Sequence, residues 1–390
     1  MTEPIQYVNN KESLVDAVDQ LNRAASISID LEFDKNFYRY GFNLCLIQIF
    51  DGATCYLFDP INDDVDIEQL FPLLESDQTQ KVCFSFDEDL RLLHSIGCFP
   101  TNLFDISLAS RLLNDPPLSL TNILQEHLDI DTGSSSQQSN WFKRPLTQKQ
   151  ILYAANDVIH LFKLRDFIIN RGEELGLSEW IKQENKLLDE LDYSDVDHND
   201  YIKEKEKNGL TEVQWHIYKQ LLEWQNGMGK KYNRPAYQII PKTYLVELSK
   251  DTRQLMNWNK TNGIFRKLKS DTYKQELLDL IKKAIDEASE LKLSDKKPAR
   301  RELTQTEHSE QLLERREIDR AKSELFKPIK EHIEQKYGNE TSNFLLSNRL
   351  ISDIVTGSNG KLPDYRKELF FNTAKDLSLD IEKLQGYLSR

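Results

Sequence analysis

Residues 26–33 read SISIDLEF, and this stretch decides the fold of the first half of the chain. Its Ile and Leu residues alternate with polar ones, and a period of two is typical of a β-strand. Asp30 and Glu32 lie two residues apart, so both carboxylates leave the same face of that strand. Carboxylates are costly in such an apolar strand unless something neutralises them, although a solvated strand face would also accept them.

More strand and helix patterns follow this first strand. The apolar runs LCLIQIF, TCYLFD and KVCFSF predict strands over 44–50, 54–59 and 81–86. Helical spacing predicts helices over 87–97, 104–114 and 120–128, and one or two helices over 147–176. Strands followed by alternating helix and strand indicate a mixed α/β sheet flanked by helices, for which we expect residues 1–190.

The second half of the chain has a different composition. Residues 191–209 are polar and charged, as in a linker, and residues 210–292 have an all-helical pattern. A second charged linker is expected over 293–311, followed by a second helical domain over 312–390.

The charge differs sharply between these segments. Residues 1–200 carry a net charge of −20, residues 201–300 carry +8, and residues 301–390 carry −1. An acidic module beside a basic one fits metal chemistry on a polyanion, because one part holds cations and the other holds phosphate. Ordinary charge variation between domains explains the same numbers equally well.

Composition excludes several other classes of protein. The chain has 390 residues with only 14 Gly and 12 Pro, which excludes collagen-like and wholly disordered chains. Its four cysteines show no CxxC spacing, so a zinc site is not expected. No run of 18 apolar residues and no signal-like N-terminus is present, so we expect a soluble protein of the cytoplasm without membrane contact.

Two further acidic positions complete a candidate site. Asp89 lies one turn into the helix expected after residue 86, where N-terminal capping explains Asp87 and Glu88 better than it explains Asp89. Tyr153 and Asp157 are four residues apart in a helix and share a face, although amphipathic helices often carry such polar pairs.

Together these residues resemble the three exonuclease motifs of the DEDD superfamily in its tyrosine subtype. The neighbouring text is similar to the ribonuclease D family in Leu46-Ile47-Gln48, Phe104-Asp105, Ser139-Asn140-Trp141 and Arg144-Pro145-Leu146. The 210–292 segment resembles the HRDC (helicase and RNase D C-terminal) domain of that family, and 312–390 resembles a diverged second copy. The resemblance implies a ribonuclease H-like exonuclease domain followed by two all-α HRDC-like domains.

The resemblance also implies a function, namely 3′–5′ hydrolysis of RNA to nucleoside 5′-monophosphates, with precursor tRNA tails as the expected substrate. Phosphodiester hydrolysis is served by two divalent cations, and carboxylates without thiolate or imidazole favour Mg²⁺ or Mn²⁺. Asp30, Glu32 and Asp157 are expected to hold one cation, and Asp30 is expected to hold the other, together with Asp89 through a bridging water. Tyr153 is expected to position the attacking water.

RNA is the expected partner of a chain that we expect to be a monomer. Its basic middle segment interleaves lysines and arginines with aromatic residues, which suits sequence-independent contact with RNA, although Trp224 is better explained as part of a helical core, so that we expect the lysines to make the contacts. The predicted RNA contacts are Gln48, Arg144, Lys230, Lys231, Arg234, Lys242, Arg266, Lys267 and Lys269.

Two positions depart from the family pattern. Phe84 stands where the family usually has histidine, and Ser134 stands where it usually has lysine. Both departures concern substrate grip and turnover more than the metal ligands. Two alternatives therefore stay open: a 3′–5′ DNA exonuclease, and a non-catalytic RNA-binding scaffold whose site has decayed.

Overall fold

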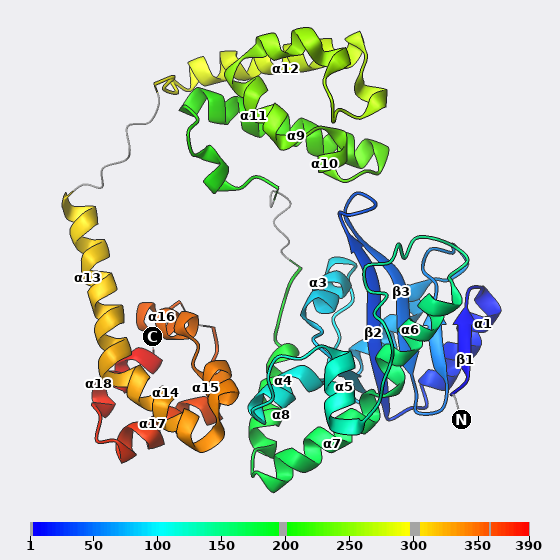
Figure 1. The fold of residues 1–390 in the computed structure, drawn as a ribbon, viewed down its shortest axis with the longest axis vertical. Helices are drawn as coiled ribbons and strands as arrows, with labels where there is room; N and C mark the ends of the chain where they lie inside the picture. The colour runs from blue at the N-terminus through cyan, green and yellow to red at the C-terminus, as the bar shows by residue number, and fades with distance from the viewer. Residues whose placement is uncertain (1–2, 195–200, 297–304, 359, 390) are drawn as a thin grey trace. The chain divides into compact units, whose positions relative to one another are not determined.

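The first domain is built on a six-stranded mixed sheet with the strand order β1-β4-β3-β2-β5-β6 (Figure 1). The computed structural model describes residues 3–194, 201–296, 305–358 and 360–389, without the side chains of 305–311. The strands are β1 (Ile5–Val8), β2 (Ser26–Lys35), β3 (Phe42–Phe50), β4 (Cys55–Phe58), β5 (Gln80–Cys83) and β6 (Leu103–Asp105). The β3–β4 pair is antiparallel, whereas β1–β4, β2–β5 and β5–β6 are parallel, which confirms the predicted mixed sheet.

Helices cover this sheet, and three of them, over 11–21, 71–75 and 178–188, lie outside the ranges predicted from the sequence. They are α1 (Lys11–Leu21), α2 (Phe71–Glu75), α3 (Asp87–Ser95), α4 (Ile106–Leu112), α5 (Leu120–Leu128), α6 (Gln148–Ile159), α7 (Leu161–Glu174) and α8 (Ser178–Leu188). The prediction of one helix over 104–114 is wrong at its start, because Phe104 pairs with Val82 of β5 in the short strand β6. The helix begins only after that strand.

Local chemistry sets two further boundaries. The 147–176 segment forms two helices, and α6 begins with a capping box in which Thr147 and Gln150 bond each other's backbone amides. The strand expected over 81–86 ends at Cys83, because Ser85 adopts a left-handed φ of 56° that ends strand geometry before α3.

The rest of the described chain contains helices and no strand. They are α9 (Glu212–Tyr232), α10 (Ala236–Ile239), α11 (Lys242–Lys250), α12 (Asp271–Glu290), α13 (Gln305–Ala321), α14 (Lys327–Tyr337), α15 (Asn339–Leu345), α16 (Asn348–Thr356), α17 (Asp364–Asp376) and α18 (Ile381–Leu388). Short 3₁₀ turns lie at Glu204–Lys207, Thr252–Lys260 and Arg266–Leu268, and a π-helical turn lies at Lys322–Phe326. The helix α13 begins inside the segment expected to be the second linker, part of which lies outside the described residues.

The chain divides into two compact units. One unit contains Met1–Glu32, Cys45–Ser194 and Leu303–Arg390, and the other contains Phe33–Leu44 and Asp195–Glu302. In the first unit a single apolar core joins residues of the sheet domain, such as Phe104 and Leu164, to residues of the C-terminal helices, such as Phe326 and Ile354. The C-terminal helices therefore share a core with the sheet domain. No helix among the described residues is both long and apolar enough to cross a lipid bilayer.

Candidate metal centre

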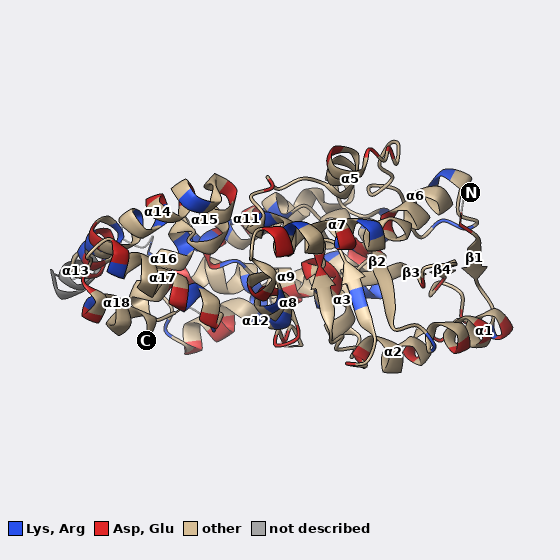
Figure 2. Cartoon of the chain, turned by 90° about the horizontal axis from the view of Figure 1, so that it is seen from below, with Lys and Arg blue, Asp and Glu red and all other residues tan. Residues whose placement is uncertain are grey.

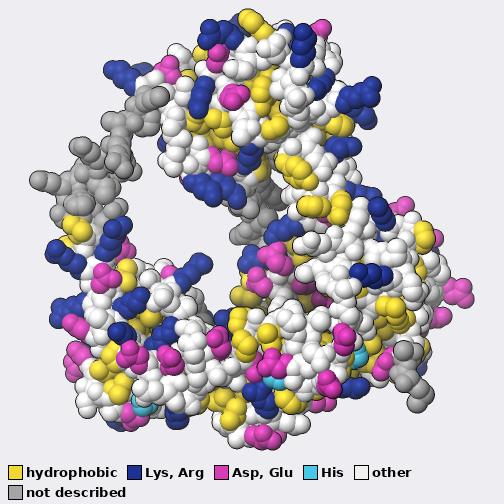
Figure 3. All heavy atoms as spheres, viewed as in Figure 1, with side chains coloured by type: hydrophobic (Ala, Val, Ile, Leu, Met, Phe, Trp, Pro, Cys, Tyr) yellow, Lys and Arg dark blue, Asp and Glu magenta, His cyan; other side chains and the backbone are white. Residues whose placement is uncertain are grey.

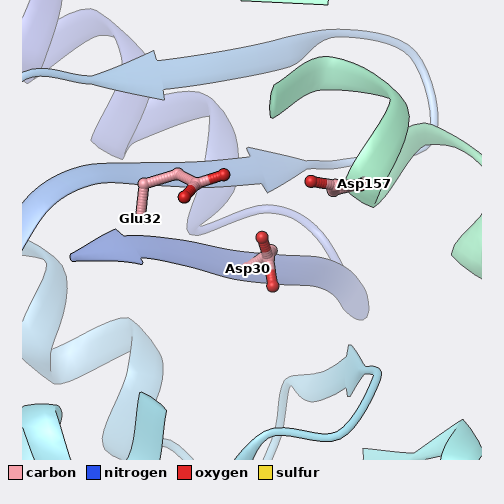
Figure 4. Close-up of side chains that lie close together, drawn as sticks. All are labelled: Asp30, Glu32 and Asp157. Atoms are coloured by element: carbon pink, nitrogen blue, oxygen red, sulfur yellow. The ribbon is translucent and has the colours of Figure 1, made fainter. Parts of the chain in front are cut away.

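Three carboxylates meet beside strand β2. Asp30 and Glu32 of β2 and Asp157 of α6 each offer an oxygen, and these oxygens lie within 4.8 Å of one another. Figure 4 shows the three side chains directed toward a common space. The structure therefore brings Asp157 beside two residues that lie 125 and 127 positions earlier in the chain, as the family resemblance implies.

Small side chains let α6 approach the sheet closely. Ala154 and Ala155 are buried in the cluster that α6 forms with β3 and β4. The Ser28 hydroxyl on β2 donates a hydrogen bond of 2.8 Å to the carbonyl oxygen of Val158. Since Ser28 and Val158 are close neighbours of Asp30 and Asp157 in the chain, this bond holds the two carboxylates at the same place.

Burial and mutual repulsion perturb these carboxylates strongly. Burial raises the pKa of Asp30 to about 7. Burial, together with repulsion from the Asp30 carboxylate, raises the pKa of Asp157 to about 8. The pKa of Glu32 is raised well above its usual range by burial and by the charges of its acidic neighbours. A cluster that resists its own ionisation in this way is ready to accept compensating positive charge.

Asp89, the fourth carboxylate predicted from the sequence, is not among the three whose oxygens lie within 4.8 Å of one another. It lies in the first turn of α3, is 7% exposed, and its Oδ1 has no hydrogen-bond partner in the part of the chain that the structure describes. Burial and the nearby charge of Asp30 raise the pKa of Asp89 well above its usual range. An unpaired buried carboxylate oxygen is costly, and a bound cation would relieve that cost.

Tyr153 lies one helical turn before Asp157 and packs against Trp141, with 6.2 Å between the ring centroids. Burial and the charges of Asp157 and Glu32 raise the pKa of Tyr153 above its ordinary value. The phenol therefore stays protonated at neutral pH, which suits a hydrogen-bond donor and not a general base.

The donor set fits a hard divalent cation. The four carboxylates supply only oxygen, and neither thiolate nor imidazole belongs to the cluster of Asp30, Glu32 and Asp157. Oxygen ligands of this kind are typical of Mg²⁺ and Mn²⁺, whereas Zn²⁺ in proteins is bound mainly by nitrogen and sulfur.

Two residues predicted to contact RNA lie inside the first domain instead, one of them buried and the other occupied by protein groups. Gln48 is completely buried, and both of its amide atoms lack partners among the described residues. The Arg144 guanidinium uses all five of its N–H groups, donating to the Asp59 carboxylate and to three backbone carbonyls, those of Cys45, Trp141 and Lys143. No donor is left for a phosphate, so Arg144 holds the loop before α6 in place. Sequence alone could not reveal this role, because Asp59 lies 85 positions away.

The basic residues of the second unit fall into two groups. Lys242 is occupied by Glu206 and by the carbonyl of Tyr201, at 2.9 and 3.0 Å. The side chains that remain at the surface are Lys230, Lys231, Arg234, Arg266 and Lys267, with Lys269 half-buried. Lys and Arg occur on α9 and α12 (Figure 2), and they are spread over the visible face of this unit (Figure 3). Lys231 also lies over the rings of Tyr232 and Tyr273.

The two departures from the family pattern lie in different surroundings. Phe84 packs against the large apolar core, so the position carries no polar group that could contact a substrate. Ser134 is exposed in the loop before α6. Both positions leave the four carboxylates intact.

Residues 5–173, which include the strands of the sheet and the carboxylate cluster, match the model of the family described as 3′-5′ exonuclease. Relatives named Ribonuclease D are 28% identical over 249 residues in Desulfotalea psychrophila and 32% identical over 226 residues in a Shewanella strain. These alignments cover 62% and 56% of this chain, and 66% and 57% of the relatives, which is less than two thirds of each relative's length.

Solved structures extend the likeness to the whole fold. The structure of Escherichia coli RNase D is 20% identical, covers 96% of this chain and 99% of its own, and gives a TM-score of 0.68. A protein from Bifidobacterium adolescentis is 16% identical, covers 98% and 100%, and gives a TM-score of 0.71. The chain is thus similar to proteins named Ribonuclease D in sequence and to the Escherichia coli RNase D structure in fold.

Proposed function

We propose that this protein is a metal-dependent 3′–5′ exoribonuclease that shortens RNA from a free 3′ end and releases nucleoside 5′-monophosphates. The meeting of Asp30, Glu32 and Asp157 in one cluster carries this proposal, because the cluster lies within the stretch that matches the exonuclease family. The names of the relatives support RNA as the substrate class. Tails of precursor tRNA or of other structured RNA are the substrates that we propose.

The residues would divide the work by position. Asp30, Glu32 and Asp157 would hold one divalent cation, and Asp30 with Asp89 would hold a second. When bound, Mg²⁺ or Mn²⁺ at these positions would supply an activated water and stabilise the charge that develops on the phosphate. The protonated Tyr153 hydroxyl would orient the attacking water through a hydrogen bond.

The proposal is tested with RNA and DNA oligonucleotides of the same sequence, each labelled at the 5′ end. With Mn²⁺ we expect a ladder of RNA shortened from the 3′ end, with nucleoside 5′-monophosphates as products and no reaction in EDTA. Shortening of DNA alone would establish the DNA exonuclease instead. Binding of RNA without any cleavage would overturn the enzyme and favour a scaffold.

Tyr153→Phe removes only the hydroxyl that we propose orients the attacking water. We expect the rate at saturating Mn²⁺ to fall about 100-fold, because a misplaced nucleophile costs about that much. The affinity for Mn²⁺ should stay unchanged, since the phenol is not among the proposed ligands. Tyr56→Phe is the matched control, because it removes a hydroxyl bonded to Asp51 elsewhere in the domain. Full activity of Tyr153→Phe would remove this role.

RNA contact by the second unit predicts a change in salt dependence. We expect the triple variant Lys230→Glu, Arg266→Glu and Lys267→Glu to bind RNA more weakly. The slope of log affinity against log salt should flatten by about 0.7 for each phosphate that the variant no longer neutralises. The control makes the same charge change at Lys322, Arg349 and Lys375, which are exposed in the C-terminal helices. Equal slopes for the two triple variants would contradict a specific role of this unit.

A further inference from the structure

The turn that presents Asp89 is held by a residue outside the carboxylate cluster. Asp105, at the end of β6, accepts hydrogen bonds of 2.9 Å from the backbone amides of both Ser85 and Phe86. Ser85 has the left-handed φ of 56°, and Phe86 is the residue before α3, which has no side-chain cap of its own. Left-handed backbone is unfavourable for a non-glycine residue, so this turn depends on its bonds to Asp105.

Asp105 is in turn fixed by helix α8. Its backbone amide donates a hydrogen bond of 2.6 Å to the side-chain oxygen of Asn185, and both residues are buried. The Asn185 amide group donates to the carbonyl of Ile181, one turn earlier in α8. Helix α8 is therefore linked to the Ser85 turn by only two residues, Asn185 and Asp105, so a displacement of α8 would displace the turn as well.

The C-terminal helices grip α8 at the residue next to Asn185. Glu184 accepts a hydrogen bond of 2.6 Å from Arg366 Nε and another from the Tyr365 hydroxyl, and all three side chains are buried. The Tyr365 ring also stacks on Trp180 of α8, with 4.9 Å between the centroids, and the Tyr365 amide donates to Gln183. The start of α17 thus holds one face of α8 by a buried ion pair, a stacked ring and a backbone bond.

We propose that the C-terminal helical segment braces the metal centre: Arg366 and Tyr365 fix α8, and Asn185 and Asp105 pass that constraint to the turn that presents Asp89. Asp105 and Arg366 are positioning residues in this arrangement, since neither touches the cluster. The inference rests on the proposed function, because it takes Asp89 as a metal ligand. When a residue that holds a metal ligand in position without touching the metal is replaced, the metal affinity commonly falls by about 10- to 100-fold.

The first experiment measures backbone hydrogen exchange over residues 84–93 without metal. It compares the full-length wild type with Asp105→Asn, Arg366→Met and Tyr365→Phe. We expect faster exchange in this segment for all three variants, because each removes a link between α17 and the turn. Tyr365→Phe loses a single hydroxyl, so it keeps the test valid if Arg366→Met fails to fold. Lys361→Met is the control, since it breaks an exposed ion pair of 2.7 Å with Glu190 just after α8.

The second experiment titrates Mn²⁺ into the same folded proteins and measures binding by calorimetry. We expect affinity to fall by at least about tenfold in Asp105→Asn, by less in Tyr365→Phe, and not at all in Lys361→Met. Unchanged exchange over 84–93 in the Tyr365 and Arg366 variants would overturn the brace. Faster exchange with unchanged Mn²⁺ affinity would show that the brace does not affect the metal centre, and would overturn that part of the proposal. A wild type that binds no Mn²⁺ would refute the proposed function, while the exchange result would still decide whether the contacts act as a brace.

Discussion

Asp30→Asn should abolish the proposed nuclease activity and leave the metal-free protein at least as stable as the wild type. Asp30 is shared by both proposed cations, so we expect the rate of 3′-end shortening to fall about 10³-fold or more. Losses of this size are typical when a substitution removes a group that stabilises charge in the transition state. Stability should rise by about 1 kcal/mol or more at pH 8, because the substitution removes a buried charge that repels its acidic neighbours.

Both effects are measured on the same preparations. Rates come from labelled RNA at saturating Mn²⁺, and the free energy of unfolding comes from urea titration in EDTA. Glu88→Gln is the matched control, because Glu88 adjoins Asp89 but its side chain is 46% exposed and pairs with Arg91. If Asp30→Asn kept full activity, the assignment of the cluster would be wrong.

The metal-free protein should lose stability as the pH rises from about 4 to about 8. The pKa values of Asp30 and Asp157 are raised to about 7 and about 8 in the folded state by burial and, for Asp157, by its acidic neighbour. Between the unfolded and folded pKa values the folded state binds more protons, so this contribution to stability is present at low pH and is lost as the pH rises. Mn²⁺ should therefore raise the melting temperature most at pH 8, where protons no longer compete for the ligands.

Other groups also titrate in this range, so the informative quantity is the difference between wild type and Asp30→Asn. We expect the two metal-free stability curves to converge at pH 4 and to separate toward pH 8. Thermal unfolding at several pH values, with Mn²⁺ and with EDTA, gives both curves. Parallel curves would show that the carboxylates do not repel one another as described.

The parts of the site that sequence could predict are those set by local pattern. The period of two placed Asp30 and Glu32 on one strand face, and helical spacing placed Tyr153 and Asp157 on one helix face. Convergence of these stretches was expected from the family resemblance, and in the structure three of the carboxylates lie within 4.8 Å of one another.

Features that depend on contacts between residues far apart in the chain could not be predicted from the sequence. A three-residue strand such as β6 exists only because β5 lies beside it, so local periodicity read it as the start of a helix. Arg144 is predicted to contact RNA, whereas in the structure its guanidinium donates to Asp59 and to three backbone carbonyls. The amino-acid composition does not indicate that the sheet domain and the C-terminal helices share a core. An apolar helix face has the same sequence pattern whichever element it packs against.

Anomalous diffraction from crystals soaked in Mn²⁺ would decide whether these carboxylates hold cations. We expect manganese peaks at the meeting point of Asp30, Glu32 and Asp157, with a second peak between Asp30 and Asp89, and neither in crystals of Asp30→Asn. Peaks elsewhere, or peaks at the cluster that persist in Asp30→Asn, would contradict the metal centre on which the proposed nuclease depends.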